Sequence, residues 1–74
     1  MPAEDLRRRY ENVLISKLRE TKYPSATMLD QIEDCITDRK AAEEYLNELI
    51  NRLEEDRYPS PPMVARVRTL LSML

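Results

Sequence analysis

Two segments of this sequence repeat each other at an offset of 35 residues, and no gap is needed to align them. Residues 10–36 and 45–71 are identical at ten of 27 positions, and all four tyrosines lie at matched positions. A repeat of this length is typical of one supersecondary unit present in two copies. The sequence therefore predicts an internal duplication. The identical pairs are Tyr10/Tyr45, Asn12/Asn47, Leu14/Leu49, Ile15/Ile50, Leu18/Leu53, Glu20/Glu55, Tyr23/Tyr58, Pro24/Pro59, Ser25/Ser60 and Met28/Met63.

Each copy contains a Tyr-Pro-Ser motif between two segments with helical periodicity. In the first segment apolar residues recur every third or fourth position, as in Leu6, Tyr10, Leu14 and Leu18, which favours a helix with one buried face. Proline disfavours the helical conformation in the residue before it, and serine is a preferred N-cap. The motif should therefore end one helix and begin the next. We expect helices over about 4–22, 26–36, 38–57 and 61–73.

Some helix starts allow more than one reading. Ser25 is well placed as an N-cap, but Thr27 and Asp30 offer a competing start two residues later. Either Thr37 or Asp38 is placed to cap the third helix, so the link between the two copies should be very short.

The fold class follows from this pattern and from the absence of glycine, which tight turns of small sheet proteins normally need. We expect an all-α chain of four helices, arranged as two tandem αα-hairpins in a compact four-helix array. Residues 1–74 should form a single helical domain, with one repeat over about 4–36 and the other over about 38–73. A solenoid needs about three repeats to bury itself, and this chain has two. The expected core consists of Leu14, Leu18, Ile32, Leu49, Leu53, Val67 and Leu70.

Catalytic and cofactor chemistry find little support in the composition. The chain has no histidine to act as a general base or a metal ligand, and no glycine for a phosphate-binding loop. Its one cysteine, Cys35, lies in an apolar stripe, where a buried structural thiol is the favoured reading over a reactive one. We expect no enzyme, no cofactor and no metal site.

A lone cysteine in an apolar stripe suits a reducing compartment, so the expected location is the cytoplasm. No apolar run reaches the roughly 18 residues that a membrane-spanning helix needs. Net charge is −2, with both signs mixed along the chain, which predicts solubility and no broad attraction for polyanions.

Two basic clusters leave nucleic-acid binding open as an alternative. Arg7, Arg8 and Arg9 form a run in the first helix, flanked by acids at Glu4, Asp5 and Glu11 that should neutralise it locally. The C-terminal stretch 57–74 contains Arg57, Arg66 and Arg68 and no acidic residue. A nucleic-acid-associated regulator would use both clusters, although nucleic acid is the less favoured partner.

The Tyr-Pro corners are the most distinctive feature of the chain. A structural role requires only that each corner ends one helix, starts the next and lays the tyrosine ring over the open end of the hairpin. A recognition role fits because a basic residue, an aromatic ring and a proline at an exposed corner are typical of interface anchors. Candidate partner-binding residues are Tyr23, Pro24, Tyr58, Pro59, Arg57, Arg66 and Arg68.

The second helices of the two copies differ in charge, with Glu33 in one matched by Arg68 in the other. Opposite charges at matched positions suit helices that meet, within one chain or between two, but drift of charge on two solvent-exposed faces is the favoured interpretation. Met73 and Leu74 extend the apolar stripe of the last helix beyond the repeat. The sequence thus predicts a non-catalytic protein–protein interaction or adaptor module. It also predicts a homodimer in which helix 26–36 of one chain pairs with helix 61–73 of another.

Overall fold

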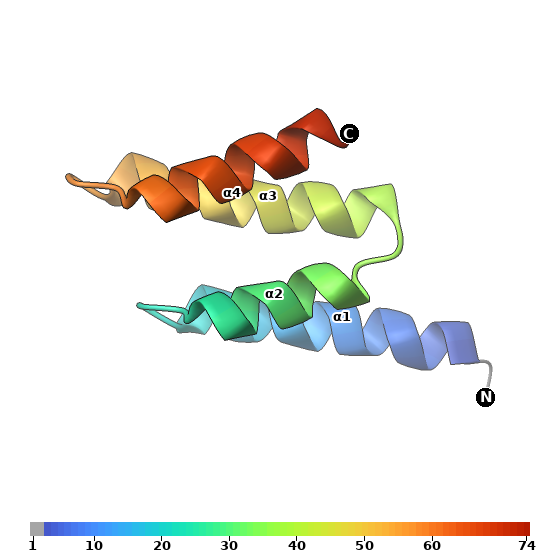
Figure 1. Cartoon of the computed structure of the whole chain (residues 1–74). Helices are drawn as coiled ribbons and strands as arrows, with labels where there is room; N and C mark the ends of the chain where they lie inside the picture. Colours follow the sequence, from blue (N-terminus) through green and yellow to red (C-terminus); the bar gives the residue numbers. More distant parts are fainter. Residues whose placement is uncertain (1–2) are drawn as a thin grey trace. The chain divides into compact units, whose positions relative to one another are not determined.

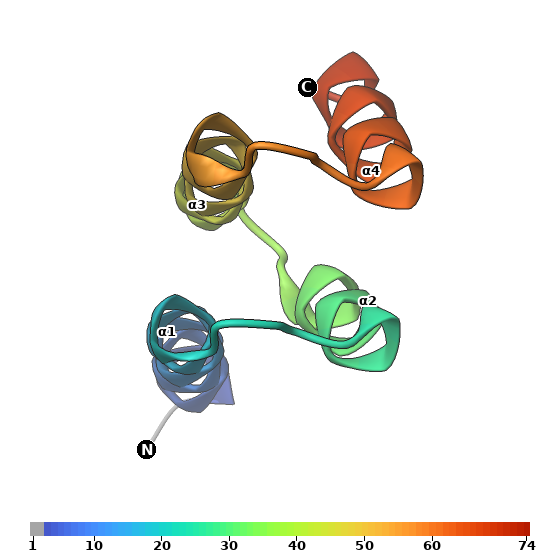
Figure 2. The same ribbon diagram turned by 90° about the vertical axis from the view of Figure 1, so that its left-hand side faces the viewer.

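Four helices account for most of the chain in a computed structural model that describes residues 3–74. They are α1 (Ala3–Glu20), α2 (Ala26–Cys35), α3 (Arg39–Glu55) and α4 (Pro61–Ser72), and these residues contain no strand. In Figures 1 and 2, α1 lies beside α2 and runs in the opposite direction, and α3 and α4 are arranged in the same way. The prediction of an all-α chain with two tandem αα-hairpins is confirmed. That the hairpins arose by duplication stays a prediction.

The chain divides into two units, one up to Ala42 and one from Glu43 to Leu74. The first unit contains the α1–α2 hairpin, and the second contains nearly all of the α3–α4 hairpin. The division falls one turn into α3 and so close to the predicted boundary between the repeats.

The corners within the hairpins form as the sequence predicts. Ser25 and Ser60 have extended backbone conformations, and each side-chain oxygen accepts a hydrogen bond from the backbone N–H three residues later. Pro61 begins α4, where its missing N–H leaves no helical hydrogen bond unmade. The competing start at Thr27 is not used.

The link between α2 and α3 is short. Ile36, the C-cap of α2, has an extended backbone, and its N–H donates to the carbonyl of Ile32. Asp38 caps α3, because its Oδ1 accepts a hydrogen bond of 2.7 Å from the N–H of Ala41. Thr37, the other candidate cap, instead bonds to the side chain of Glu11.

None of the described residues has a positive φ and none follows a cis peptide bond. Many helices end with a left-handed glycine. This chain has no glycine, and α1 and α3 are followed instead by bends at residues 22–23 and 57–58, directly before proline.

The buried residues agree in part with the predicted core. Leu18, Ile32, Leu49 and Val67 are buried, whereas Leu14, Leu53 and Leu70 are only half-buried. Periodicity identifies the inward face of a helix but not how completely its edges are covered. The prediction omitted other buried side chains, which are Glu11, Ile15, Leu29, Ala41, Tyr45 and Leu46.

The N-terminal half of α1 departs from the expected burial. Leu6 and Tyr10 belong to the predicted apolar face, yet both side chains are more than half exposed. The matched residues of α3 are Ala41 and Tyr45, and these are buried. Equivalent positions in the two hairpins therefore have different surroundings.

Candidate functional site

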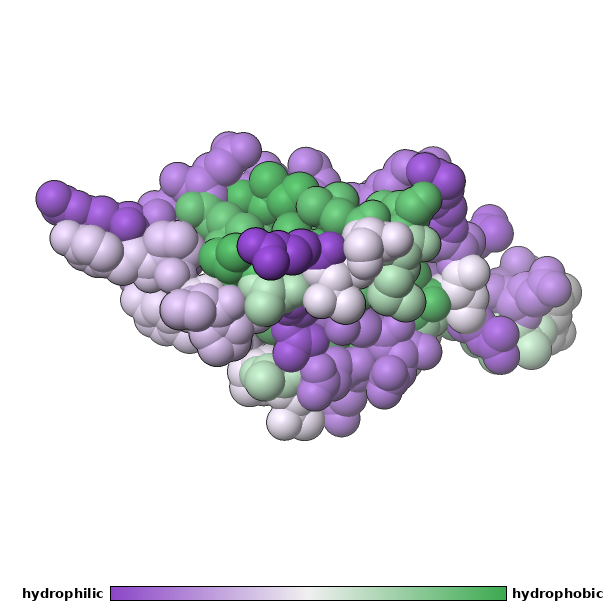
Figure 3. Space-filling view, turned by 45° about the horizontal axis from the view of Figure 1, so that its top comes forward, coloured by the Kyte–Doolittle hydropathy of each residue, from purple (hydrophilic) through white to green (hydrophobic). Residues whose placement is uncertain are grey.

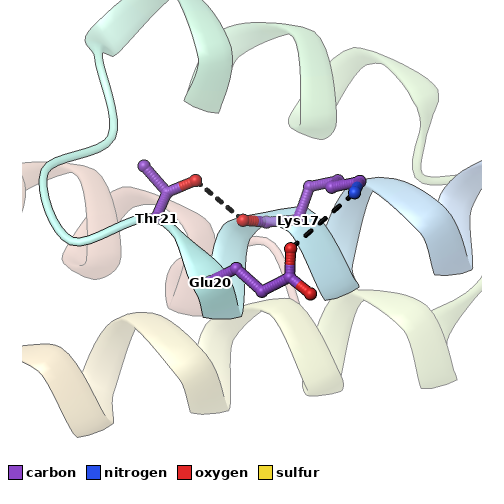
Figure 4. Close-up of polar contacts among 3 residues, drawn as sticks. All are labelled: Lys17, Glu20 and Thr21. Atoms are coloured by element: carbon purple, nitrogen blue, oxygen red, sulfur yellow. Dashed lines mark hydrogen bonds and ion pairs between the residues drawn. The ribbon is translucent and has the colours of Figure 1, made fainter.

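The corner between α1 and α2 is built by local hydrogen bonds. The Thr21 N–H donates to the carbonyl of Leu18, and its hydroxyl donates to the carbonyl of Lys17 at 2.7 Å. Figure 4 shows the hydroxyl bond beside an ion pair in which the Lys17 Nζ lies 3.7 Å from the Glu20 Oε2. These contacts close the end of α1, and the chain then bends at Lys22 and Tyr23 before Ser25 caps α2.

The corner between α3 and α4 has the same local design. The N–H of Asp56 donates to the carbonyl of Arg52, which closes the last turn of α3. The chain bends at Arg57 and Tyr58, Pro59 follows, and Ser60 caps α4. Pro59 is exposed, whereas Pro24 of the first corner is half-buried.

Both corner tyrosines project into solvent. Tyr23 is 83% exposed and Tyr58 is 84% exposed. A ring laid over the open end of a hairpin would lose most of its accessible surface, so this structural role is wrong for both rings. The proline and the serine of each motif shape the corner, but the tyrosine has no packing role that explains its presence twice.

A cation lies near each of these rings. The Lys22 Nζ is 5.6 Å from the centroid of the Tyr23 ring, and the Arg57 Cζ is 5.7 Å from that of Tyr58. Both distances fall within the range of a cation–π contact, which is weak at an exposed site. Each corner therefore presents an aromatic ring and a positive charge together.

The other predicted site residues lie farther along α4. Arg66 is half-buried and Arg68 is exposed, and they are about two helical turns from the corner. The structure thus brings Arg57 against Tyr58 and leaves Arg66 and Arg68 on the body of the helix.

The arginine run of the nucleic-acid alternative is exposed on α1. Arg8 and Arg9 line a shallow, open depression along one face of this helix, together with Asp5, Lys17 and Glu20. Two carboxylates in the same depression reduce its attraction for phosphate.

Glu11 differs from its predicted role beside the arginine run. It is 98% buried, and its Oε1 accepts a 2.9 Å hydrogen bond from the Thr37 hydroxyl. Within residues 3–74, no donor reaches its Oε2. One indication of this burial is present in the sequence, since the residue of α3 that matches Glu11 is the apolar Leu46, which is also buried.

Replacing Glu11 by leucine should raise the free energy of unfolding by about 1–3 kcal/mol, because burying an unsatisfied carboxyl oxygen costs about that much. Leu46 shows that this sequence accepts leucine at the matched position. Urea unfolding followed by circular dichroism measures the change. Glu20→Leu, at an exposed position of the same helix, is the control and should change stability by less than about 0.5 kcal/mol. A net loss in Glu11→Leu would mean that the bond to Thr37 outweighs the burial cost.

Cys35 is half-buried, and its Sγ–H donates to the carbonyl of Ile32 at 3.2 Å. Burial, and then the negative charge of Glu11, raise the pKa of this thiol. A raised pKa keeps the sulfur protonated at neutral pH, where a thiol is a poor nucleophile. Among residues 3–74, no three His, Cys, Asp or Glu side chains cluster closely enough to hold a metal ion.

No helix of the described chain has both the length and the apolar character needed to cross a membrane. No protein-family model matches the sequence, and the comparisons with curated proteins and with solved structures give no match.

Proposed function

We propose that this chain is a non-catalytic protein-binding module that uses its two Tyr-Pro corners as anchors. The proposal is carried by the exposure of Tyr23 and Tyr58, which are both more than four-fifths accessible. Tyrosine is enriched at interface hot spots because it offers a large contact area and fixes only two side-chain torsions.

The backbone of each corner supports this role. Proline restricts its own φ and the conformation of the tyrosine before it, and the serine cap ties the corner to the next helix. A corner that is ordered before binding loses less entropy when a partner covers it. The expected partner surface is an apolar pocket for the ring, with an acidic side chain nearby for Lys22 or Arg57.

The test is protein capture from cells that express the chain, with the wild type and Tyr23→Ala/Tyr58→Ala as baits. We expect mass spectrometry to find that the double variant captures at least tenfold less of the specific partners than the wild type. Loss of an interface hot spot has an effect of this size. Ser16→Ala is the control, since Ser16 is exposed on α1 and lies outside both corners. Partners retained equally by all three baits would contradict the proposal.

The second proposal, a nucleic-acid-associated regulator, rests on the exposure of Arg7, Arg8, Arg9 and Arg68. Binding to a duplex DNA or RNA probe, measured at about 50 and 200 mM salt, separates the two functions. If the chain contacts several phosphates, its affinity for the probe should fall by orders of magnitude between these two salt concentrations. We expect little binding at either salt concentration, given the carboxylates of Asp5 and Glu20 beside Arg8 and Arg9.

A further inference from the structure

The first and last helices each expose an apolar stripe. On α1 it consists of Leu6, Tyr10 and Val13, at the spacing i, i+4, i+7. On α4 it consists of Val64 and Leu71, with Leu74 just beyond the helix end. Figure 3 shows apolar surface gathered in a band over the α3–α4 hairpin. We call these two surfaces the α1 stripe and the α4 stripe.

Three of the matched positions, Ala41, Tyr45 and Leu29, are buried. Tyr10 is 55% exposed, whereas Tyr45 on α3 is 1% exposed. Val64 is 39% exposed, whereas Leu29 on α2 is 3% exposed. The residue types of both stripes are therefore ones that this sequence buries elsewhere.

The charges beside the two stripes are complementary. Glu4 and Asp5 are exposed in the first turn of α1, and Arg68 is exposed on α4 beside its stripe. At the offset of 35 residues, Glu4 and Asp5 match Arg39 and Lys40, and Arg68 matches Glu33, so every sign is reversed. Complementary charges of this kind fix the register of an interface and exclude like-charged pairings.

We propose that a second copy of this chain docks its α4 stripe on the α1 stripe, with Arg68 facing Glu4 and Asp5. The α2 helix, which the sequence suggested as the partner of α4, is the poorer candidate because its Leu29 and Ile32 are already buried. The proposal is independent of the Tyr-Pro corners.

This contact joins two different surfaces, so each bound copy still presents one open stripe unless the two copies dock both stripes reciprocally. Such a heterologous contact grows into longer assemblies unless its rotation closes a ring. Helical repeat proteins normally cap their end repeats with polar surfaces, and neither stripe is polar. With one helix on each side the interface is small, so association should be weak.

Sedimentation equilibrium from about 10 µM to 1 mM, a range suited to weak association, tests the proposal. For the wild type, the average mass should rise above that of a monomer as the concentration increases. Tyr10→Asp and Leu71→Asp should each be monomeric, because each lacks one stripe. Their equimolar mixture should reach a dimer and no more, since one variant retains the α4 stripe and the other the α1 stripe.

Ser16→Asp and Thr69→Asp, at exposed positions on the same helices but outside the stripes, should associate like the wild type. Circular dichroism checks that every variant is folded, and Leu6→Asp with Val64→Asp provides a second pair if one of the first is not. Arg68→Glu should weaken association at least threefold at low salt, whereas Arg57→Glu, at a corner, should not. A monomeric wild type or a mixture that stays monomeric would each overturn the proposal.

Discussion

Replacing Tyr45 by alanine should lower the free energy of unfolding by about 3–5 kcal/mol, the usual cost of truncating a buried aromatic residue to alanine. Tyr45 is the largest fully buried side chain of the described residues, and only 1% of it is exposed. The core of a domain this small rarely supplies more than about 3–5 kcal/mol, so the variant should be partly or wholly unfolded at room temperature. Urea unfolding followed by the helical circular dichroism signal measures the loss.

Tyr10→Ala provides the matched control, because Tyr10 lies at the same position of the other hairpin and is more than half exposed. Its truncation should cost less than about 0.5 kcal/mol at concentrations where the chain is monomeric. Equal losses of unfolding free energy in Tyr45→Ala and Tyr10→Ala would contradict the burial that the structure gives these two tyrosines.

Leu18→Ala should cost about 2–5 kcal/mol, because Leu18 is fully buried in α1 and its removal leaves a cavity. Leu53, at the matched position of α3, is only half-buried, so Leu53→Ala should cost less than about 2 kcal/mol. The midpoints of thermal unfolding should therefore rank wild type, Leu53→Ala and Leu18→Ala from highest to lowest. The reverse order of the two variants would contradict the burial that the structure gives these leucines.

Much of the fold could be predicted from the sequence because its boundaries depend on local chemistry. The pre-proline tyrosines and the capping serines act within a few residues of each other, and the observed helix ends lie within two residues of those expected. Burial is not local. The apolar periodicity of α1 includes Leu6 and Tyr10, but whether another element covers them depends on tertiary structure.

The candidate site was predictable in the same way. The positions of Tyr23 and Tyr58 followed from their prolines, but their exposure did not, since an aromatic ring at a corner can equally pack on its own hairpin. Glu11 was the reverse case. Its charge and its arginine neighbours predicted a solvent-exposed side chain. The structure buries it and bonds it to Thr37, which is far along the chain, so local sequence could not predict this position.

No described residue has a positive φ, so the fold does not require glycine. The absence of glycine from the sequence affects the unfolded state. A sequence with no glycine and five prolines has fewer accessible conformations when unfolded than an average chain of 74 residues. Less conformational entropy is therefore lost on folding, and this effect matters most where the core is small. Part of the stability of these hairpins lies in the restricted freedom of the denatured chain rather than in any contact of the folded one.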